Sequence, residues 1–360
     1  MELAGMSLTG GFTYTAPPPE NKAAWFGGGY SGSQISRVDR ITYETDTDTA
    51  TTRGPLSMAR SALAAASNFN YGWFAGGTGP GGGVSIVDRI TFATDTATAS
   101  VRGPLSATNY LFAAAGNTTD GWFGGGLSSG VSSTVQRITY ATDTATASVR
   151  GPLSSARYGL AAAGNTTDGW FGGGNPGARS TVDRITYATD TATASVRGPL
   201  SLARRQLAAA ANSTDAWFGG GYIPSTTSQS SRVDRITFAT DTATASVRGP
   251  LSADIQRLAA TGNDTDGWFG GGSNGPVKST VARITYATDT ATASVRGPLS
   301  SAREFLAAAS SLSYAWFGGG SPGPTSLVDR ITFATDTATA SVRGPLSAVI
   351  AREGAAGGIQ

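Results

Sequence analysis

The sequence predicts an all-β fold, a seven-bladed β-propeller with four antiparallel strands in each blade. The pair Trp-Phe, followed by glycines, recurs seven times about every 48 residues, which is the spacing of propeller blades. Each copy carries short apolar segments separated by turn residues, a pattern typical of strands. The 50 glycines suit tight turns and closely packed sheets. The recurring Trp residues, expected to be structural, are Trp25, Trp73, Trp122, Trp170, Trp217, Trp268 and Trp316.

The inner half of one repeat is visible in residues 158–174. Residues 158–163 are apolar and small, which suits an innermost strand where blades converge on the axis. Residues 165–169 read Asn-Thr-Thr-Asp-Gly, a hairpin turn signal. Residues 169–174 are then the second strand, and its Trp and Phe supply large apolar groups for the interface between blades.

The outer half of the same repeat follows a variable loop at 175–181. Residues 182–187 are β-branched and alternate in polarity, which predicts the third strand. The turn Thr-Asp-Thr at 189–191 leads into the outer strand, 193–197, which ends at Gly-Pro. Four strands in a meander therefore form one blade.

The chain ends predict how the ring closes. Six inner strands lie between consecutive repeats, and the seventh small-residue segment lies at the C-terminus, residues 350–357. We expect this segment to pair beside Trp25 and close the ring. The propeller then covers residues 21–360. Residues 1–20 contain three consecutive prolines, which cannot donate ladder hydrogen bonds, and they are expected to form an arm or linker.

Charged residues recur at fixed places in all seven copies. An Arg in the third strand lies in a sheet covered on both faces, so it needs a partner. We expect a structural network with the Asp of the following turn or with backbone carbonyls, and seven identical ligand sites are the alternative. A second Arg, in the outer strand, is expected to face solvent and protect the sheet edge. The third-strand set is Arg40, Arg89, Arg137, Arg184, Arg235, Arg283 and Arg330, and the outer-strand set is Arg53, Arg102, Arg150, Arg197, Arg248, Arg296 and Arg343.

These features resemble kelch repeats over residues 21–360. The matching features are the glycine pair closing strand two, the Val-Asp-Arg-Ile-Thr-Tyr strand, the Thr-Asp-Thr turn, the Pro-Leu after strand four and the Arg before strand one. The chain departs from the kelch pattern because the Trp expected after the turn is replaced by small residues, as at 145–148, and the aromatic pair precedes the glycines instead. The amino-acid sequence of the repeat is also similar to that of kelch-like virion proteins of tailed phages.

Two sites differ between copies, and they are predicted to share one face. Strand direction alternates in a meander, so the loop after strand two and the loop that joins blades emerge together. We call this the variable face, and the opposite face, with its repeated turns, the uniform face. Drift in unconstrained loops is the alternative explanation. The candidate ligand-binding residues on the variable face are Tyr30, Tyr110, Tyr158, Arg179, Arg205 and Tyr222.

The residue inventory argues against several functional classes. The chain has no His and no Cys, so the usual nucleophile–base pairs and metal ligands are missing, and neither a cofactor nor a metal is expected. A net charge of +2 without a basic tract argues against nucleic-acid binding, and no apolar run is long enough for membrane insertion. Asp46 and Asp48 are expected to form a turn rather than bind calcium.

The sequence thus predicts a non-enzymatic binding or structural propeller. We expect a virion or extracellular adhesion component that recognises a surface glycan or protein, and residues 1–20 could contact other virion proteins. An intracellular kelch-type interaction scaffold, located in the cytoplasm, is the second hypothesis. A glycosidase built on two carboxylates such as Asp254 and Glu304 is the third.

Overall fold

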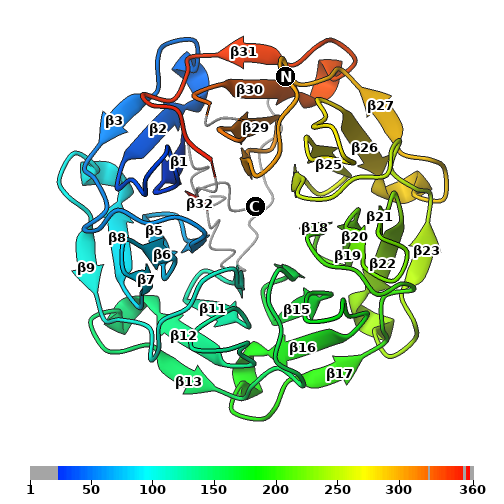
Figure 1. The fold of residues 1–360 in the computed structure, drawn as a ribbon, viewed down its shortest axis with the longest axis horizontal. Coiled ribbons are helices and arrows are strands. Elements are labelled where there is room, and N and C mark those ends of the chain that lie inside the picture. Colours follow the sequence, from blue (N-terminus) through cyan, green and yellow to red (C-terminus); the bar gives the residue numbers. More distant parts are fainter. Residues whose placement is uncertain (1–22, 323–324, 352–353, 357–360) are drawn as a thin grey trace, which may run out of the picture.

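The computed structural model describes residues 23–322, 325–351 and 354–356, and the arm expected at residues 1–20 lies outside them. Seven four-stranded antiparallel sheets form a closed ring, as Figure 1 shows. The innermost strands surround a central channel, which has a cavity at each end. The predicted seven-bladed propeller is therefore confirmed. We number the blades from 1 to 7 in chain order, starting from the blade that contains Trp25.

Four strands run from the channel to the perimeter in every blade. The innermost strands are β32 (Gly354–Ala356), β4 (Ala64–Ser67), β10 (Ala113–Gly116), β14 (Ala161–Gly164), β18 (Ala208–Ala211), β24 (Ala259–Gly262) and β28 (Ala307–Ser310). The second strands are β1 (Ala23–Gly27), β5 (Tyr71–Ala75), β11 (Asp120–Gly124), β15 (Asp168–Gly172), β19 (Asp215–Gly219), β25 (Asp266–Gly270) and β29 (Tyr314–Gly318).

The outer half of each blade contains two strands and a short 3-10 turn. The third strands are β2 (Val38–Thr42), β8 (Val87–Thr91), β12 (Val135–Thr139), β16 (Val182–Thr186), β22 (Val233–Thr237), β26 (Val281–Thr285) and β30 (Val328–Thr332). The 3-10 turns are η1 (Tyr43–Thr45), η2 (Phe92–Thr94), η3 (Tyr140–Thr142), η4 (Tyr187–Thr189), η5 (Phe238–Thr240), η6 (Tyr286–Thr288) and η7 (Phe333–Thr335). The outer strands are β3 (Thr51–Arg53), β9 (Ser100–Arg102), β13 (Ser148–Arg150), β17 (Ser195–Arg197), β23 (Ser246–Arg248), β27 (Ser294–Arg296) and β31 (Ser341–Arg343).

Ring closure follows the predicted scheme. β32 pairs antiparallel with β1, so that Trp25 lies opposite Ala356 and Gly27 opposite Gly354. The innermost strand of blade 1 thus comes from the C-terminal end of the described chain, while its other three strands come from the N-terminal end. Among the residues that the structure describes, blade 1 is the only place where two distant parts of the sequence complete one sheet.

The Trp-Phe pair joins each blade to both neighbours. The seven Trp residues are at most 3% exposed, and each indole stacks on an aromatic ring of the next blade at centroid distances of 3.7–4.0 Å. Trp122, for example, stacks on Tyr187. The sequence assigned Tyr187 to the third strand, but it begins η4, and this turn directs its ring into the interface. The neighbouring Phe171 packs toward the previous blade, where a Cβ added at Gly124 would lie 3.0 Å from its ring.

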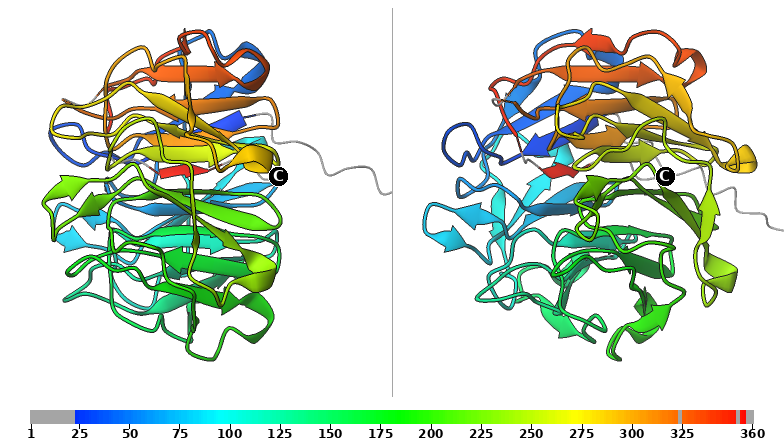
Figure 2. Two further views of the ribbon diagram at one scale, coloured as in Figure 1. Left: turned by 90° about the vertical axis from the view of Figure 1, so that its right-hand side faces the viewer. Right: turned by 45° about the vertical axis from the view of Figure 1, so that its right-hand side comes forward.

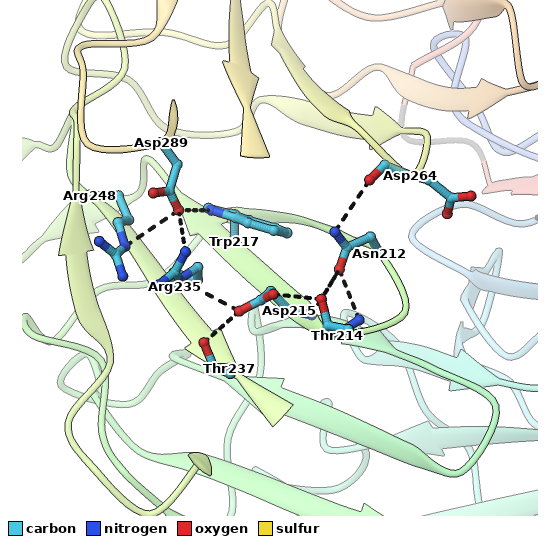
Figure 3. A network of polar contacts seen from close by, with 9 residues as sticks. All are labelled: Asn212, Thr214, Asp215, Trp217, Arg235, Thr237, Arg248, Asp264 and Asp289. Atoms are coloured by element: carbon cyan, nitrogen blue, oxygen red, sulfur yellow. Dashed lines mark hydrogen bonds and ion pairs between the residues drawn. The ribbon is translucent and has the colours of Figure 1, made fainter. Parts of the chain in front are cut away.

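The Asp of each 3-10 turn connects adjacent blades, as Figure 3 shows for blades 5 and 6. Asp289 Oδ2 accepts a hydrogen bond from Trp217 Nε1 at 2.7 Å and lies 3.3 Å from Arg235 Nη1. Arg248 Nε lies 3.4 Å from the same oxygen. The other six blades repeat this arrangement, with Asp46, Asp95, Asp143, Asp190, Asp241 and Asp336 in the place of Asp289. We call it the Asp clamp.

The geometry of the Asp clamp tests two predictions made for the repeated Arg residues. The third-strand Arg does pair with a turn Asp, but that Asp belongs to the next blade. The outer-strand Arg was expected to face solvent, and this is wrong. Its side chain is only 13–18% exposed because it reaches across the interface to the same carboxylate. The adjacent Gly permits this approach, since a Cβ at Gly198 would lie 1.5 Å from the carbonyl oxygen of Ala243 in the next blade.

A second side-chain network runs around the uniform face. Asn212 Oδ1 accepts hydrogen bonds from the backbone nitrogens of Thr214 and Asp215, which fixes the turn between strands one and two. Its Nδ2 donates to the carbonyl oxygen of Asp264 in the next blade at 3.3 Å (Figure 3). The same inter-blade bond is made by Asn68, Asn117, Asn165 and Asn263.

Candidate binding site

The two variable sites meet on one face, as their positions in the meander require. Backbone bridges join each blade-joining loop to the loop after strand two of the same blade, for example Tyr158 to Asn175 and Arg205 to Tyr222. In blades 2 and 5 the second loop forms a small hairpin, β6–β7 (Thr78–Gly79, Gly82–Gly83) and β20–β21 (Tyr222–Ile223, Ser228–Gln229). Both hairpins project from the same side of the disc in Figure 2.

A ring of backbone hydrogen bonds surrounds the channel on this face. One residue in each of six blade-joining loops has a positive φ of 55–61°. In blades 3 to 7 its nitrogen bonds to the equivalent carbonyl of the preceding blade. Gln206 N, for example, bonds to Gly159 O at 2.9 Å, and Arg257 N to Gln206 O at 3.0 Å. Left-handed backbone is uncommon for residues other than glycine, and such strain often lies at functional sites. The ring residues are Ala62, Leu111, Gly159, Gln206, Arg257 and Phe305.

The ring encloses a cavity of about 520 Å³ at the mouth of the channel. This volume lies within the range of roughly 300–1,000 Å³ that is usual for small-molecule sites. The wall combines apolar groups with a few polar ones, which is also the usual composition of such sites. Among the lining residues are Leu111, Tyr158, Asn175, Arg205, Arg257 and Phe305.

The six candidate residues divide into two groups. Tyr158 and Arg205 line the cavity, and the Arg205 guanidinium lies 5.1 Å from the ring centroid of Tyr222. Asn175, which the sequence did not single out as a ligand-binding residue, donates from Nδ2 to the hydroxyl of Tyr158.

The other three candidates lie away from the cavity wall. Tyr30 is 40% exposed and Arg179 is exposed. Tyr110 is half-buried, with its ring beside Gly83 of the β6–β7 hairpin. The structure therefore places Tyr158 and Arg205 in the wall of one cavity, with Tyr222 beside Arg205 and outside the wall.

The cavity rim is electrostatically asymmetric. In blades 6 and 7, Arg257 Nη1 lies 3.2 Å from Glu304 Oε1, and Glu304 also accepts a hydrogen bond from Ser273. In blade 5, Arg205 makes neither an ion pair nor a side-chain hydrogen bond within residues 23–322, 325–351 and 354–356, and its Nε is buried. Both guanidinium groups lie over an aromatic ring, since Arg257 is 4.8 Å from the ring centroid of Phe305. The two sides of the rim therefore differ in charge pairing: Arg257 is neutralised and Arg205 is not.

Part of the variation that the sequence assigned to ligand recognition is structural. In blades 2, 4, 5 and 7 an Arg lies two positions before the ring residue. It is fully buried and pairs with the Asp of strand three, as in Arg60–Asp88 at 2.6 Å and Arg157–Asp183 at 2.9 Å. Burial lowers the pKa of Arg157, and the nearby Asp183 carboxylate acts in the opposite direction. Arg204–Asp234 and Arg303–Asp329 are the same pair in blades 5 and 7.

In blades 3 and 6 both members of this pair change together, whereas blade 1 keeps the Asp, Asp39, opposite Ile350. Blade 3 has Asn109 with Gln136, and blade 6 has Ile255 with Ala282, so a polar pair and an apolar pair replace the ionic one. The sequence shows that residues 136 and 282 are not Asp, and in the same two blades the loop residue is not Arg. This correlation is the signal from which the contact between the loop and strand three could have been predicted.

The carboxylates considered for glycoside hydrolysis do not come together at the cavity. Glu304 is bound to Arg257 and Ser273, and Asp254 is exposed and does not belong to the cavity wall. Among the described residues, no group of three or more acidic side chains could hold a metal ion. Within the same residues, no helix is long and apolar enough to cross a membrane.

A second cavity of about 700 Å³ lies at the opposite end of the channel. Its wall consists of the small residues of the innermost strands and of the turns that carry the Asn network, including Asn165 and Asn212. The Ala and Asn positions of this wall mostly repeat from blade to blade, whereas the turn tip varies, as in Thr166, Ser213 and Asp264.

Comparison with known proteins supports the fold. No family model matches the chain, and no curated protein matches it. Among solved structures, the chain is similar to the one titled "Structure of YjhT", with a TM-score of 0.62, 10% sequence identity, and coverage of 80% of this chain and 98% of the other. At this level of identity the likeness shows a shared propeller fold.

Proposed function

We propose that this propeller is a non-enzymatic recognition domain that binds a saccharide or a protein on a biological surface through its variable face. The observation that carries the proposal is the convergence of the diversified side chains on the rim of one cavity. The residues that hold the blades together lie elsewhere, in the Asp clamps and the Asn network, so ligand contacts on this face can change without loss of the fold.

The chemistry of the rim supports a binding role. Tyr158 and Tyr222 offer a flat apolar ring and a hydroxyl, which suit both sugar rings and protein partners. Arg205 and Asn175 add donors that can fix the orientation of a ligand. The resemblance of the repeat to kelch-like virion proteins of tailed phages favours a virion or extracellular location, where several copies on one particle would raise the avidity of weak sites.

An intracellular interaction scaffold is the second candidate, because protein binding is the common role of kelch propellers. The half-buried Tyr110 and the exposed Leu111 and Tyr30 on the same face would contribute apolar contact area to a protein partner. Hydrolysis of a glycoside is not favoured by the positions of Asp254 and Glu304.

A loop exchange tests the proposal. Residues 30–37, 175–181 and 222–232 are replaced by Gly-Ser stretches of equal length, and binding is measured on an array of immobilised oligosaccharides and on immobilised bacterial cells. We expect the exchanged protein to lose binding while its circular dichroism and thermal transition stay close to those of the original.

A matched control changes the opposite face. Thr118→Ser and Thr166→Ser alter two turn tips on the uniform face and should leave binding unchanged. A folded loop-exchange protein that binds as well as the original would contradict the proposal and would direct attention to the uniform face or to residues 1–20.

A further inference from the structure

Arg205 is set apart from the other cations that line the cavity. The second cation in the wall, Arg257, is neutralised by Glu304, whereas Arg205 makes no ion pair with any described residue. Its guanidinium is held at 5.1 Å over Tyr222, and its backbone is bridged to the same residue. Stacking of this kind restricts the side chain and leaves the edge of its fork free for hydrogen bonds.

The neighbours of Arg205 are neutral and polar. The backbone bond from Gln206 N to Gly159 O joins this sector to Tyr158, whose hydroxyl accepts a hydrogen bond from Asn175. Around the unpaired guanidinium, the part of the wall that the structure describes provides aromatic faces, an amide and a hydroxyl, but no carboxylate. A ligand that complements this sector needs one negative charge and a body with ring faces and hydroxyl groups.

We infer that Arg205 binds the carboxylate of an acidic saccharide, a uronic acid residue, whose sugar ring lies in the part of the cavity lined by blades 4 and 5. A planar carboxylate matches the two parallel donors of a guanidinium. A concave cavity of about 520 Å³ suits a sugar better than an extended acidic peptide, which would need a groove. The inference rests on the proposed function, which it makes specific to one ligand class and one sector of the rim.

The test uses a matched pair of ligands. One is a glucuronate-containing tetrasaccharide, and the other is the same tetrasaccharide with its carboxylates reduced to alcohols. We expect the acidic form to bind at least about 10-fold more tightly, because a hydrogen bond to a charged group contributes more than a neutral one. Equal affinity for the two forms would overturn the inference.

Two variants locate the charge effect. Arg205→Gln should weaken binding of the acidic form by about 10-fold or more and leave the reduced form unchanged. Arg205→Lys keeps the charge but loses the planar fork and the stacking, so its affinity should lie between the two. An Arg205→Gln protein that still prefers the acidic form by the original factor would contradict the assignment to Arg205.

The control removes one positive charge from the same face outside the cavity wall. Lys278→Gln changes a half-buried residue in the loop after strand two of blade 6, and affinity for the acidic form should stay within about 2-fold of the original. A loss as large as that of Arg205→Gln would show a general effect of charge on the variable face and would overturn the assignment to Arg205.

A third ligand distinguishes the ligand class. Hexaglutamate carries the same charged group on a peptide, and we expect it to bind more weakly than the acidic tetrasaccharide. Binding of hexaglutamate that is tighter and depends on Arg205 would overturn the saccharide and favour an acidic protein partner. If instead the loop exchange leaves array binding intact, the proposed function itself fails, and that outcome is separate from equal binding of the acidic and reduced tetrasaccharides.

Discussion

The two faces of the disc join the same blades by different means. On the uniform face the Asn network and the Asp clamp join adjacent blades through side chains, in addition to backbone bonds such as that from Gly198 N to Asp241 O. On the variable face the ring positions are joined through backbone atoms, as in the bond from Gln206 N to Gly159 O, and the Arg257–Glu304 pair adds a side-chain contact between blades 6 and 7. A side-chain bond fixes the residue type, whereas a backbone bond accepts any residue that tolerates the local conformation. This difference explains why one face repeats and the other diversifies.

The contrast between the faces also shows which residue differences between blades the fold does not constrain. The ring position on the variable face holds Ala62, Leu111, Gly159, Gln206, Arg257 and Phe305, six residue types with one backbone conformation. Two residues earlier in the same loop, the side chain enters the interior, and in blades 2 to 7 it changes only together with its partner in strand three. Variation near a candidate site is therefore evidence of recognition only where the side chain reaches the cavity.

The largest effect is expected from opening the ring, because both kinds of inter-blade bond depend on closure. Deletion of residues 348–360 removes β32, leaves the edge of β1 unpaired and removes the fully buried Ile350. We expect a loss of at least about 5 kcal/mol, comparable with the whole stability of many domains, together with aggregation through the exposed edge. Urea denaturation and size-exclusion chromatography measure both effects.

The control for this deletion is a shorter one. Removal of residues 357–360 retains the pairs from Trp25 to Gly27 and should change stability little. A long deletion that unfolds at the original urea concentration would show that β32 does not hold the ring together.

The second prediction breaks one side-chain clamp. Trp170→Ala removes the stack on Phe238 and the hydrogen bond to Asp241, and should cost about 3–5 kcal/mol. Trp170→Phe keeps a stacked ring but leaves the carboxylate without its indole donor, and should cost about 1–3 kcal/mol. The variable-face control, Gln206→Ala, should cost less than about 1 kcal/mol because its inter-blade bond is made by the backbone. Similar losses at Trp170 and Gln206 would refute the contrast between the faces.

Much of the fold could be predicted from the sequence, because the repeat shows its own periodicity. The Trp-Phe pairs, the small inner strands and the C-terminal closing segment depend on local composition and on spacing along the chain. Contacts between repeats could not be read in the same way. The outer-strand Arg197 looked solvent-facing because its partner, Asp241, belongs to the next blade.

The candidate site was predicted only in outline. The alternation of strand direction placed Tyr158, Arg205 and Tyr222 on one face correctly. It could not distinguish them from Tyr30 and Arg179, which lie away from the cavity, because that depends on the path of each loop. The sequence also could not show that Arg204 is buried while the adjacent Arg205 is accessible, because this depends on the left-handed residue that follows them.

The third prediction exchanges a buried pair between blades. Arg157→Asn alone leaves Asp183 buried without its cation and should cost about 3–5 kcal/mol. The double change Arg157→Asn with Asp183→Gln copies blade 3, and it should recover at least about 1 kcal/mol relative to the sum of the single changes. The free energies of unfolding of the four proteins in this cycle measure the coupling. Additive single changes would mean that the covariation of Asn109 with Gln136 has no energetic basis.

The fourth prediction concerns blade 1, where the pair is incomplete. Asp39 occupies the place of Asp183, but the loop position opposite holds Ile350, and the carboxylate instead accepts hydrogen bonds from Ser347. Burial raises the pKa of Asp39 above its ordinary value of 3.8, and the bonds from Ser347 and the charge of Arg37 only partly oppose this.

The direction of the pH effect follows from that raised pKa. The stabilising contribution of a carboxyl group with a raised folded-state pKa is fully present below about pH 4 and is lost as the pH rises through the folded pKa. Asp39→Asn cannot ionise, so it should gain stability relative to the original as the pH is raised from 4 to 7, by less than about 1 kcal/mol.

Asp183→Asn is the matched control, and at pH 7 it should lose about 3 kcal/mol because Arg157 would be left buried without its anion. Thermal unfolding of the three proteins at several pH values tests both signs. If Asp39→Asn were destabilised at pH 7 as strongly as Asp183→Asn, then hydrogen bonds from Ser347 would hold a buried carboxylate as well as an arginine does, and the incomplete pair of blade 1 would not be a weak point of the ring.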